Sequence, residues 1–173
     1  MSAVATKGKW AQGIRPRNFH WVIADRLAVC ERPGGYGANH RKVRRQEEII
    51  WVREQGFTCV VSVISAPHNL HNYDEVGVVW RHRPIPDDEM AAYELGLYQE
   101  LRQMLQSGQR VLLHGEELGD RVCGLTAGYL LWNELIDTAP RTVTVIERLT
   151  QRQLGPAGRE MVSVSASLPR PQG

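Results

Sequence analysis

Short apolar runs and longer amphipathic stretches alternate along this chain. Residues 57–64 (FTCVVSVI) are apolar almost throughout, which is typical of a strand buried on both faces of a sheet. The short run at residues 111–113 (VLL) has the same character. Taken together, these runs predict strands at residues 19–23, 27–30, 57–64, 78–80 and 111–113.

The stretches between these strands carry apolar residues at helical spacing. They predict helices at residues 40–55, 87–107, 122–135, 142–149 and 156–164. Gly56 and Gly108 are expected to end the first two helices. Residues 122–135 are apolar on nearly every side, which predicts a central, buried helix. Because strands alternate with helices, we expect an α/β fold with a central, mostly parallel sheet flanked by helices.

The length of 173 residues suits one domain. We expect a disordered N-terminal tail at residues 1–17, a folded domain at residues 18–164 and a disordered C-terminal tail at residues 165–173. No stretch of about 18 apolar residues occurs, so no membrane-spanning helix is expected. The three cysteines form no CxxC pair and residues 1–13 lack the apolar core of a signal peptide, which together favour the cytoplasm.

Charge adds little to this description. The net charge is +2, which by itself indicates no acidic partner. The densest basic run, RKVRR at residues 41–45, would form a patch if it met the other arginines Arg15, Arg17, Arg81 and Arg83. A solvated helix face is the simpler interpretation, with Arg44 paired to Glu48 four residues later. No nucleic-acid-binding signature accompanies the run, so nucleic acid is not expected as a partner.

Residues 111–135 are the part of the sequence that carries chemistry. A buried strand leads through the loop HGEELGDR, residues 114–121, into the apolar helix. The start of a helix offers unpaired N–H groups and the positive end of the helix dipole, so such a loop is a generic anion site. Arg121, at the end of the loop, can hold a phosphate with two parallel hydrogen bonds. A cysteine at the start of such a loop would be a thiolate able to attack phosphorus.

His114 and Arg121, seven residues apart, resemble the His-Cys-five-residues-Arg signature of the dual-specificity phosphatases. The resemblance extends to NFHWV at residues 18–22, to RLA at residues 26–28 and to Ile85-Pro86-Asp87. It covers roughly residues 18–162.

The resemblance implies a phosphatase-like fold and assigns a role to several positions. Position 115 corresponds to the nucleophile, Asp87 to the general acid and Arg121 to the arginine that binds phosphate. The family's histidine at position 114 makes hydrogen bonds that shape the loop. The ligand-binding loop implied in this way consists of His114, Glu116, Glu117, Leu118, Gly119, Asp120 and Arg121.

The loop departs from the family pattern at several positions. Gly115 stands where the family has cysteine, and glycine cannot form a phosphoenzyme. Val122 replaces the usual hydroxyl residue, and Leu118 stands at the usual mid-loop glycine, with Gly119 one place later. Branches of the family that have lost activity also carry glycine at the nucleophile position. Several departures together favour natural loss of the nucleophile over one engineered substitution.

The formal charge of the loop also opposes a bound anion. Glu116, Glu117 and Asp120 against Arg121 give −3 + 1 = −2, with histidine neutral. Arg121 either binds an anion or pairs with these carboxylates and ties the loop, and we expect the second. A metal site that combines His114 with the carboxylates is not expected, because adjacent residues rarely converge on one ion, and no cofactor is expected.

Other reactive side chains are given structural roles. Cys123, in the first turn of the apolar helix, and Cys59, in an apolar strand, are expected in the core, whereas Cys30 is expected to be partly exposed. None is expected to be a nucleophile. Without a nucleophile, Asp87 has nothing to protonate, and Asp88 beside it is a suitable helix N-cap.

The sequence therefore predicts a pseudophosphatase, a phosphatase-like protein without catalysis that acts as a binding or regulatory module. Its expected partner is a protein, with a phosphorylated partner as one option, and not a membrane. The alternative is a dual-specificity or tyrosine protein phosphatase whose active form has cysteine at position 115. A third hypothesis is a protein that binds a small anionic ligand.

Overall fold

The computed structural model describes residues 12–172 and contains a five-stranded sheet with the order β1-β2-β5-β3-β4. β1 pairs antiparallel with β2, and the other neighbouring pairs are parallel. The strands are β1 His20–Ile23, β2 Leu27–Cys30, β3 Cys59–Ser62, β4 Val79–His82 and β5 Val111–His114. The predicted α/β architecture with a mostly parallel sheet is confirmed.

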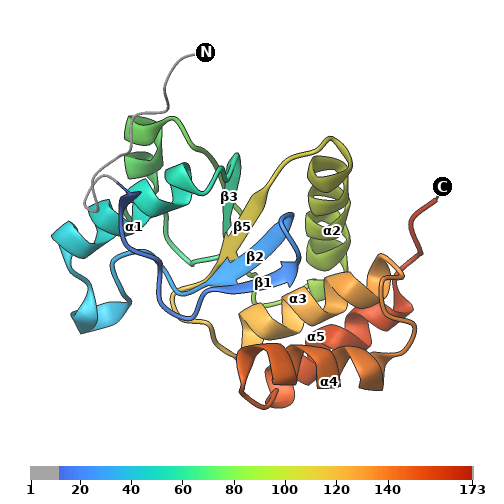
Figure 1. The fold of residues 1–173 in the computed structure, drawn as a ribbon. Helices are drawn as coiled ribbons and strands as arrows, with labels where there is room; N and C mark the ends of the chain where they lie inside the picture. Colours follow the sequence, from blue (N-terminus) through green and yellow to red (C-terminus); the bar gives the residue numbers. More distant parts are fainter. Residues whose placement is uncertain (1–11, 173) are drawn as a thin grey trace.

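Helices cover both faces of the sheet (Figure 1). α1 lies on one side together with a 3-10 helix, η3, and α2, α3, α4 and α5 lie on the other. The helices are η2 Gly37–Asn39, α1 Lys42–Glu54, η3 Leu70–Val76, α2 Met90–Gln106, α3 Asp120–Trp132, α4 Ala139–Thr150 and α5 Pro156–Ser167. The sequence pattern did not predict η3, whose flanking residues Asn69 (φ 61°) and Gly77 (φ 72°) have left-handed backbone conformations.

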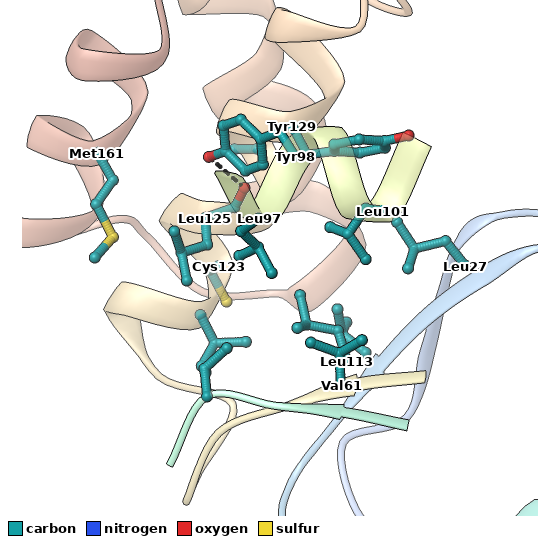
Figure 2. Close-up of a cluster of buried hydrophobic side chains, with 14 of the residues drawn as sticks. Leu27, Val61, Leu97, Tyr98, Leu101, Leu113, Cys123, Leu125, Tyr129 and Met161 are labelled. Carbon is teal, nitrogen blue, oxygen red and sulfur yellow. Dashed lines mark hydrogen bonds between the residues drawn. The ribbon is translucent and has the colours of Figure 1, made fainter. Parts of the chain in front are cut away.

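β2, β3 and β5 are buried at every residue, which confirms the prediction for the apolar runs at residues 57–64 and 111–113. The edge strands β1 and β4 are only partly buried. In β2, Leu27 and Val29 join the core under α2, α3 and α5, whereas Ala28 and Cys30 join the core under α1. Figure 2 shows the first of these cores. There the Tyr98 hydroxyl of α2 donates to the Leu125 carbonyl of α3 at 2.9 Å and so joins the two helices.

α3 is central because it packs closely against α5. A Cβ atom at Gly124 of α3 would lie only 2.5 Å from the Cα atom of Gly158 in α5, so these two helices touch through bare backbone. Every residue from Val122 to Trp132 is buried. The predicted central helix is therefore confirmed, although it begins at Asp120 and ends at Trp132.

Both expected tail boundaries differ from the structure. The prediction of a C-terminal tail from residue 165 is wrong, because α5 continues to Ser167, Leu168 is buried in the core, and the Trp132 indole donates to the Pro169 carbonyl at 2.7 Å. At the other end, Ile14 donates its N–H to Glu47 of α1 at 3.0 Å, which places residues before 18 against the domain. Residues 1–11 lie outside the described part of the chain. Within that part, no helix is long and apolar enough to cross a membrane.

Candidate functional site

β5 and α3 position the loop that the sequence singled out. β5 lies between β2 and β3, and its last residue, His114, pairs in register with Cys30 and Ser62. The loop at residues 115–119 therefore leaves the carboxyl edge of the parallel strands, where ligands of open α/β sheets bind. α3 begins directly after it, with Gly119 at the N-cap.

His114 shapes the loop through its ring. The side chain is 1% exposed, and Nδ1 lies 2.9 Å from the carbonyl oxygen of Gly115. A carbonyl only accepts, so Nδ1 carries the proton. Burial lowers the pKa of His114 to about 4, so the ring is neutral at pH 7. The hydrogen bond joins the ring to Gly115, the first residue of the loop.

Gly115, at the nucleophile position, is packed against Val122. A Cβ atom at position 115 would lie 2.4 Å from Cγ2 of Val122 and 3.2 Å from the carbonyl oxygen of Glu117. Val122 is 5% exposed in the first turn of α3, where a valine has one strongly preferred rotamer. The valine methyl therefore fills the space that the first atom of a nucleophilic side chain would need.

Two of the three loop carboxylates point away from the loop. Glu116 Oε2 lies 3.2 Å from a terminal nitrogen of Arg32. The Asp120 carboxylate accepts from the main-chain N–H groups of Gly155 at 2.6 Å and Gly158 at 2.9 Å, at the N-terminus of α5. Glu117 is exposed and has no partner among the described residues. The carboxylates thus oppose an anion much less than their formal charge suggested.

Arg121 is not held by the carboxylates of its own loop. Its guanidinium donates to the carbonyl oxygen of Pro86 at 3.1 Å, and no described carboxylate lies within 4 Å. The expectation that Glu116, Glu117 or Asp120 ties Arg121 is therefore wrong. The physical reason is that Glu116 and Asp120 find partners outside the loop, in segments far away in the sequence.

The segment after β4 lies beside Arg121, as the resemblance implied. Asp87, which follows Pro86, is exposed. The predicted N-cap role of Asp88 is wrong, because α2 begins at Met90 and its N-cap, Glu89, has no side-chain capping bond. The geometry thus brings Arg121 and the predicted acid segment together but gives Asp88 no role in the helix.

The main chain of the loop leaves its donors available. The carbonyls of Glu116, Leu118 and Gly119 accept from Arg32, Arg152 and Cys123, respectively. The N–H groups of residues 115–119 donate to no atom of the described chain. Outward carbonyls and unpaired amides at a helix start are the arrangement that binds anions.

Leu118 and Arg152 fix the middle of the loop. Leu118 stands where the family usually has its mid-loop glycine. Its side chain is 3% exposed and belongs to the core between the sheet and α3. Arg152, beyond α4, donates to the Leu118 carbonyl. Sequence reasoning missed Arg152 and Arg32 because no local spacing connects either arginine to the loop.

The cysteines are structural. All three are free and buried, and the expected exposure of Cys30 is wrong because its position in β2 places it between the sheet and α1. Burial raises the pKa of Cys30, and it raises the pKa of Cys123 to about 11. Neither thiol resembles the exposed, low-pKa cysteine that a nucleophile requires.

The basic residues do not form one patch. Arg44 pairs with Glu48 at 2.5 Å, as the spacing predicted, and with Glu31 at 3.4 Å. Arg83 instead pairs with Glu100 of α2, at 2.8 Å, on the other side of the sheet from α1.

The fold is the one found in dual-specificity and tyrosine phosphatases. No family model and no curated protein matches the sequence. Among solved structures, the chain is similar to Tk-PTP in its active form, with 17% identity, a TM-score of 0.70 and coverage of 86% of this chain and 96% of that one.

Two further structures show the same fold. A kinase-associated phosphatase whose catalytic cysteine is replaced by serine has 18% identity and a TM-score of 0.72, with coverage of 88% of this chain and 98% of that one. The human tyrosine phosphatase-like serine/threonine/tyrosine-interacting protein has 12% identity and a TM-score of 0.61, with coverage of 85% and 93%. At these identities the similarity establishes the fold, and the chemistry of this chain must come from its own residues.

Proposed function

We propose that this chain is a non-catalytic, phosphatase-like binding module that recognises a phosphorylated protein partner through the loop at residues 115–121. The observation that carries the proposal is the contact between Gly115 and Val122. A methyl group of Val122 stands where a nucleophile would begin, and neither residue offers a group that can attack phosphorus or assist a thiolate.

Binding without turnover is supported by the rest of the loop. The unpaired amides of residues 115–119 and the start of α3 form a field that favours an oxyanion. Arg121 has no ion-pair partner among the described residues, so its guanidinium can turn from a neutral carbonyl to a phosphate and gain a charge-assisted bond. Pro86, the present acceptor, marks the side of the loop from which the partner would approach.

The alternative of an active phosphatase requires cysteine at position 115. The side chain of Val122 stands against it, because a cysteine there would have to displace the valine methyl. We also propose the cytoplasm as the location, which fits three free thiols.

The test is to measure binding and turnover on the same protein. Calorimetry with phosphotyrosine and phosphothreonine peptides should detect binding that the unphosphorylated peptides lack. Arg121→Ala should weaken that binding strongly and leave the melting temperature nearly unchanged, because the Arg121 hydrogen bond is exposed. Hydrolysis of p-nitrophenyl phosphate by the unmodified chain, lost in Arg121→Ala, would instead favour the enzyme hypothesis. Absence of phosphopeptide binding would overturn the binding role.

A further inference from the structure

A second group of cations lies on the outer side of the loop. Arg32 is 9% exposed, and its guanidinium meets the Glu116 carboxylate at 3.2 Å. Asn69 orients its amide oxygen to accept from another nitrogen of Arg32 at 3.0 Å and from Arg45 of α1 at 3.2 Å. Arg32 and Arg45 therefore share the neutral Asn69 oxygen as an acceptor. Only Arg32 also forms an ion pair with a carboxylate, that of Glu116.

Arg45 carries a positive charge that is not matched by an ion pair within the described chain. Among the described residues it forms no ion pair within 4 Å, whereas the adjacent Arg44 pairs with two glutamates. Its Nη1 atom also faces the His40 ring at 3.3 Å. Burial and the charge of Arg32 lower the pKa of Arg45, while Glu75 raises it. Burial, Arg32 and Arg45 lower the pKa of His40 in the same way, which indicates a local excess of positive charge.

One edge of the Arg45 guanidinium makes no hydrogen bond within the described chain. Nη1 is engaged by Asn69 and His40, whereas Nε is buried without a partner and Nη2 makes no hydrogen bond to the described chain. Nε and Nη2 lie on the same side of a guanidinium and together bind the two oxygens of a carboxylate or phosphate.

Arg45 also lines a narrow cavity. It is lined by Arg32, Arg45, His68, Asn69, Tyr73 and His114 and has a volume of about 10 Å³. The Tyr73 hydroxyl and the Nε2 atom of His114, both almost fully buried, also lack partners. The cavity has room for about one oxygen atom, so the rest of a larger ligand must lie at its mouth, where His68 is exposed.

We propose that this outer cleft, formed by Arg32, Arg45, His68 and Asn69, binds a second oxyanion carried by the same partner that the loop binds. The proposal rests on the proposed function and narrows it to a partner segment with two negative groups. Arg45 is connected to the loop residue Glu116 through only Asn69 and Arg32. An extended chain spans about 3.3–3.6 Å per residue, so an acidic side chain a few residues from the phosphorylated one can reach the cleft.

Peptides of one sequence test the cleft at fixed ionic strength. Each carries one phosphotyrosine and, a few residues away, phosphoserine, glutamate or serine. We expect the unmodified chain to bind the first two about tenfold more tightly than the third, the effect of one charge-assisted hydrogen bond. Arg45→Gln should remove this preference. Lys42→Gln, the same change of charge at an exposed residue of α1, should keep it.

The outcomes separate the cleft from the loop. If Arg45→Gln still prefers the peptides with a second negative group, the proposed cleft is wrong. The same holds if Lys42→Gln loses the preference equally, because the preference would then reflect the general positive charge of α1. Arg121→Gln should lower the affinity for all three peptides and keep the preference for those with a second negative group.

If no peptide binds the unmodified chain, the proposed function fails, and the cleft is then tested alone. Sulfate titrated into the Arg121→Gln variant should shift the Arg45 Nε–H resonance saturably, whereas a resonance that does not respond would overturn the oxyanion site in the cleft.

Discussion

At the scale of single residues, Gly115 and Val122 act as a pair. The sequence shows two separate departures from the phosphatase signature, and the structure shows that they occupy one space. Glycine leaves room for the valine methyl, and the valine closes the room that a cysteine would need. A single substitution at position 115 would not account for an apolar residue at position 122, so the pair favours a natural glycine over one engineered change.

This pairing predicts the outcome of restoring the nucleophile. Gly115→Cys should lower the free energy of unfolding by about 1–3 kcal/mol, because its Cβ atom overlaps Val122. It should show no turnover of p-nitrophenyl phosphate. Adding Val122→Ser should recover part of the stability, and urea titrations of both single variants and the double variant would give a coupling energy of about 0.5–3 kcal/mol.

One result for Gly115→Cys would contradict this prediction. Gly115→Cys with unchanged stability and single-turnover rates of about 1–10³ s⁻¹ would show that the site is intact apart from its thiol. The enzyme hypothesis would then replace the binding module.

At the scale of secondary-structure elements, the loop is held from outside by segments that are distant in the sequence. Arg32 after β2, Arg152 after α4 and the N-terminus of α5 each hold one part of it. These contacts engage loop carbonyls and two carboxylates and leave the N–H groups of residues 115–119 without a partner in the described chain. The position of α5 against α3 therefore helps to hold the loop that we propose as the anion site.

The Asp120 cap of α5 gives a prediction at this scale. Asp120→Ala removes the acceptor of two main-chain N–H groups at the start of α5, so the free energy of unfolding should fall by about 1–2 kcal/mol. Glu117→Ala makes the same change of charge in the same loop at an exposed, unpartnered side chain, and its effect should stay within about 0.5 kcal/mol. Equal losses in urea titrations of the two variants would mean that loop charge, and not the cap, stabilises α5.

The same contacts explain what the sequence could and could not predict. Continuous apolar runs predicted the buried strands, and the all-round apolar pattern predicted α3, because both depend on local composition. The loop and its departures from the signature were also visible locally. The partners of Glu116, Asp120 and Arg121 were not, because each lies more than thirty residues away and depends on how the elements pack. The buried Leu168 shows the same limit, since one apolar residue in a polar tail gives no periodic signal.

At the scale of the whole molecule, two buried titratable groups change the free energy of unfolding in opposite directions as the pH rises. Glu94 of α2 is fully buried, and burial raises its pKa to about 8. The protonated acid can donate to the Tyr98 hydroxyl, 3.1 Å away, which in turn donates to Leu125 of α3. His114 is also buried, but its pKa is lowered to about 4. The first group stabilises the fold only while protonated, and the second only while neutral.

The last prediction follows from Glu94. Between its unfolded value of 4.5 and its folded pKa of about 8, the folded state holds a proton that the unfolded chain has released. Stability from this group is therefore complete below pH 4.5 and is lost as the pH rises toward 8. Glu94→Gln keeps the donor without the titration, so urea midpoints measured from pH 5 to about 8.5 should fall less steeply for this variant than for the unmodified chain.

The control is Glu160→Gln, which changes an exposed carboxylate whose charge also raises the pKa of Glu94. It should keep most of the alkaline slope, because burial is the larger cause of the shift. On the acid side, protonation of His114 as the pH falls from 6.5 through about 4 should destabilise both variants and the unmodified chain alike. Parallel curves for Glu94→Gln and the unmodified chain above pH 6 would show that Glu94 is ionised in the folded protein. The contact between α2 and α3 would then depend on a buried charge, and not on a protonated acid.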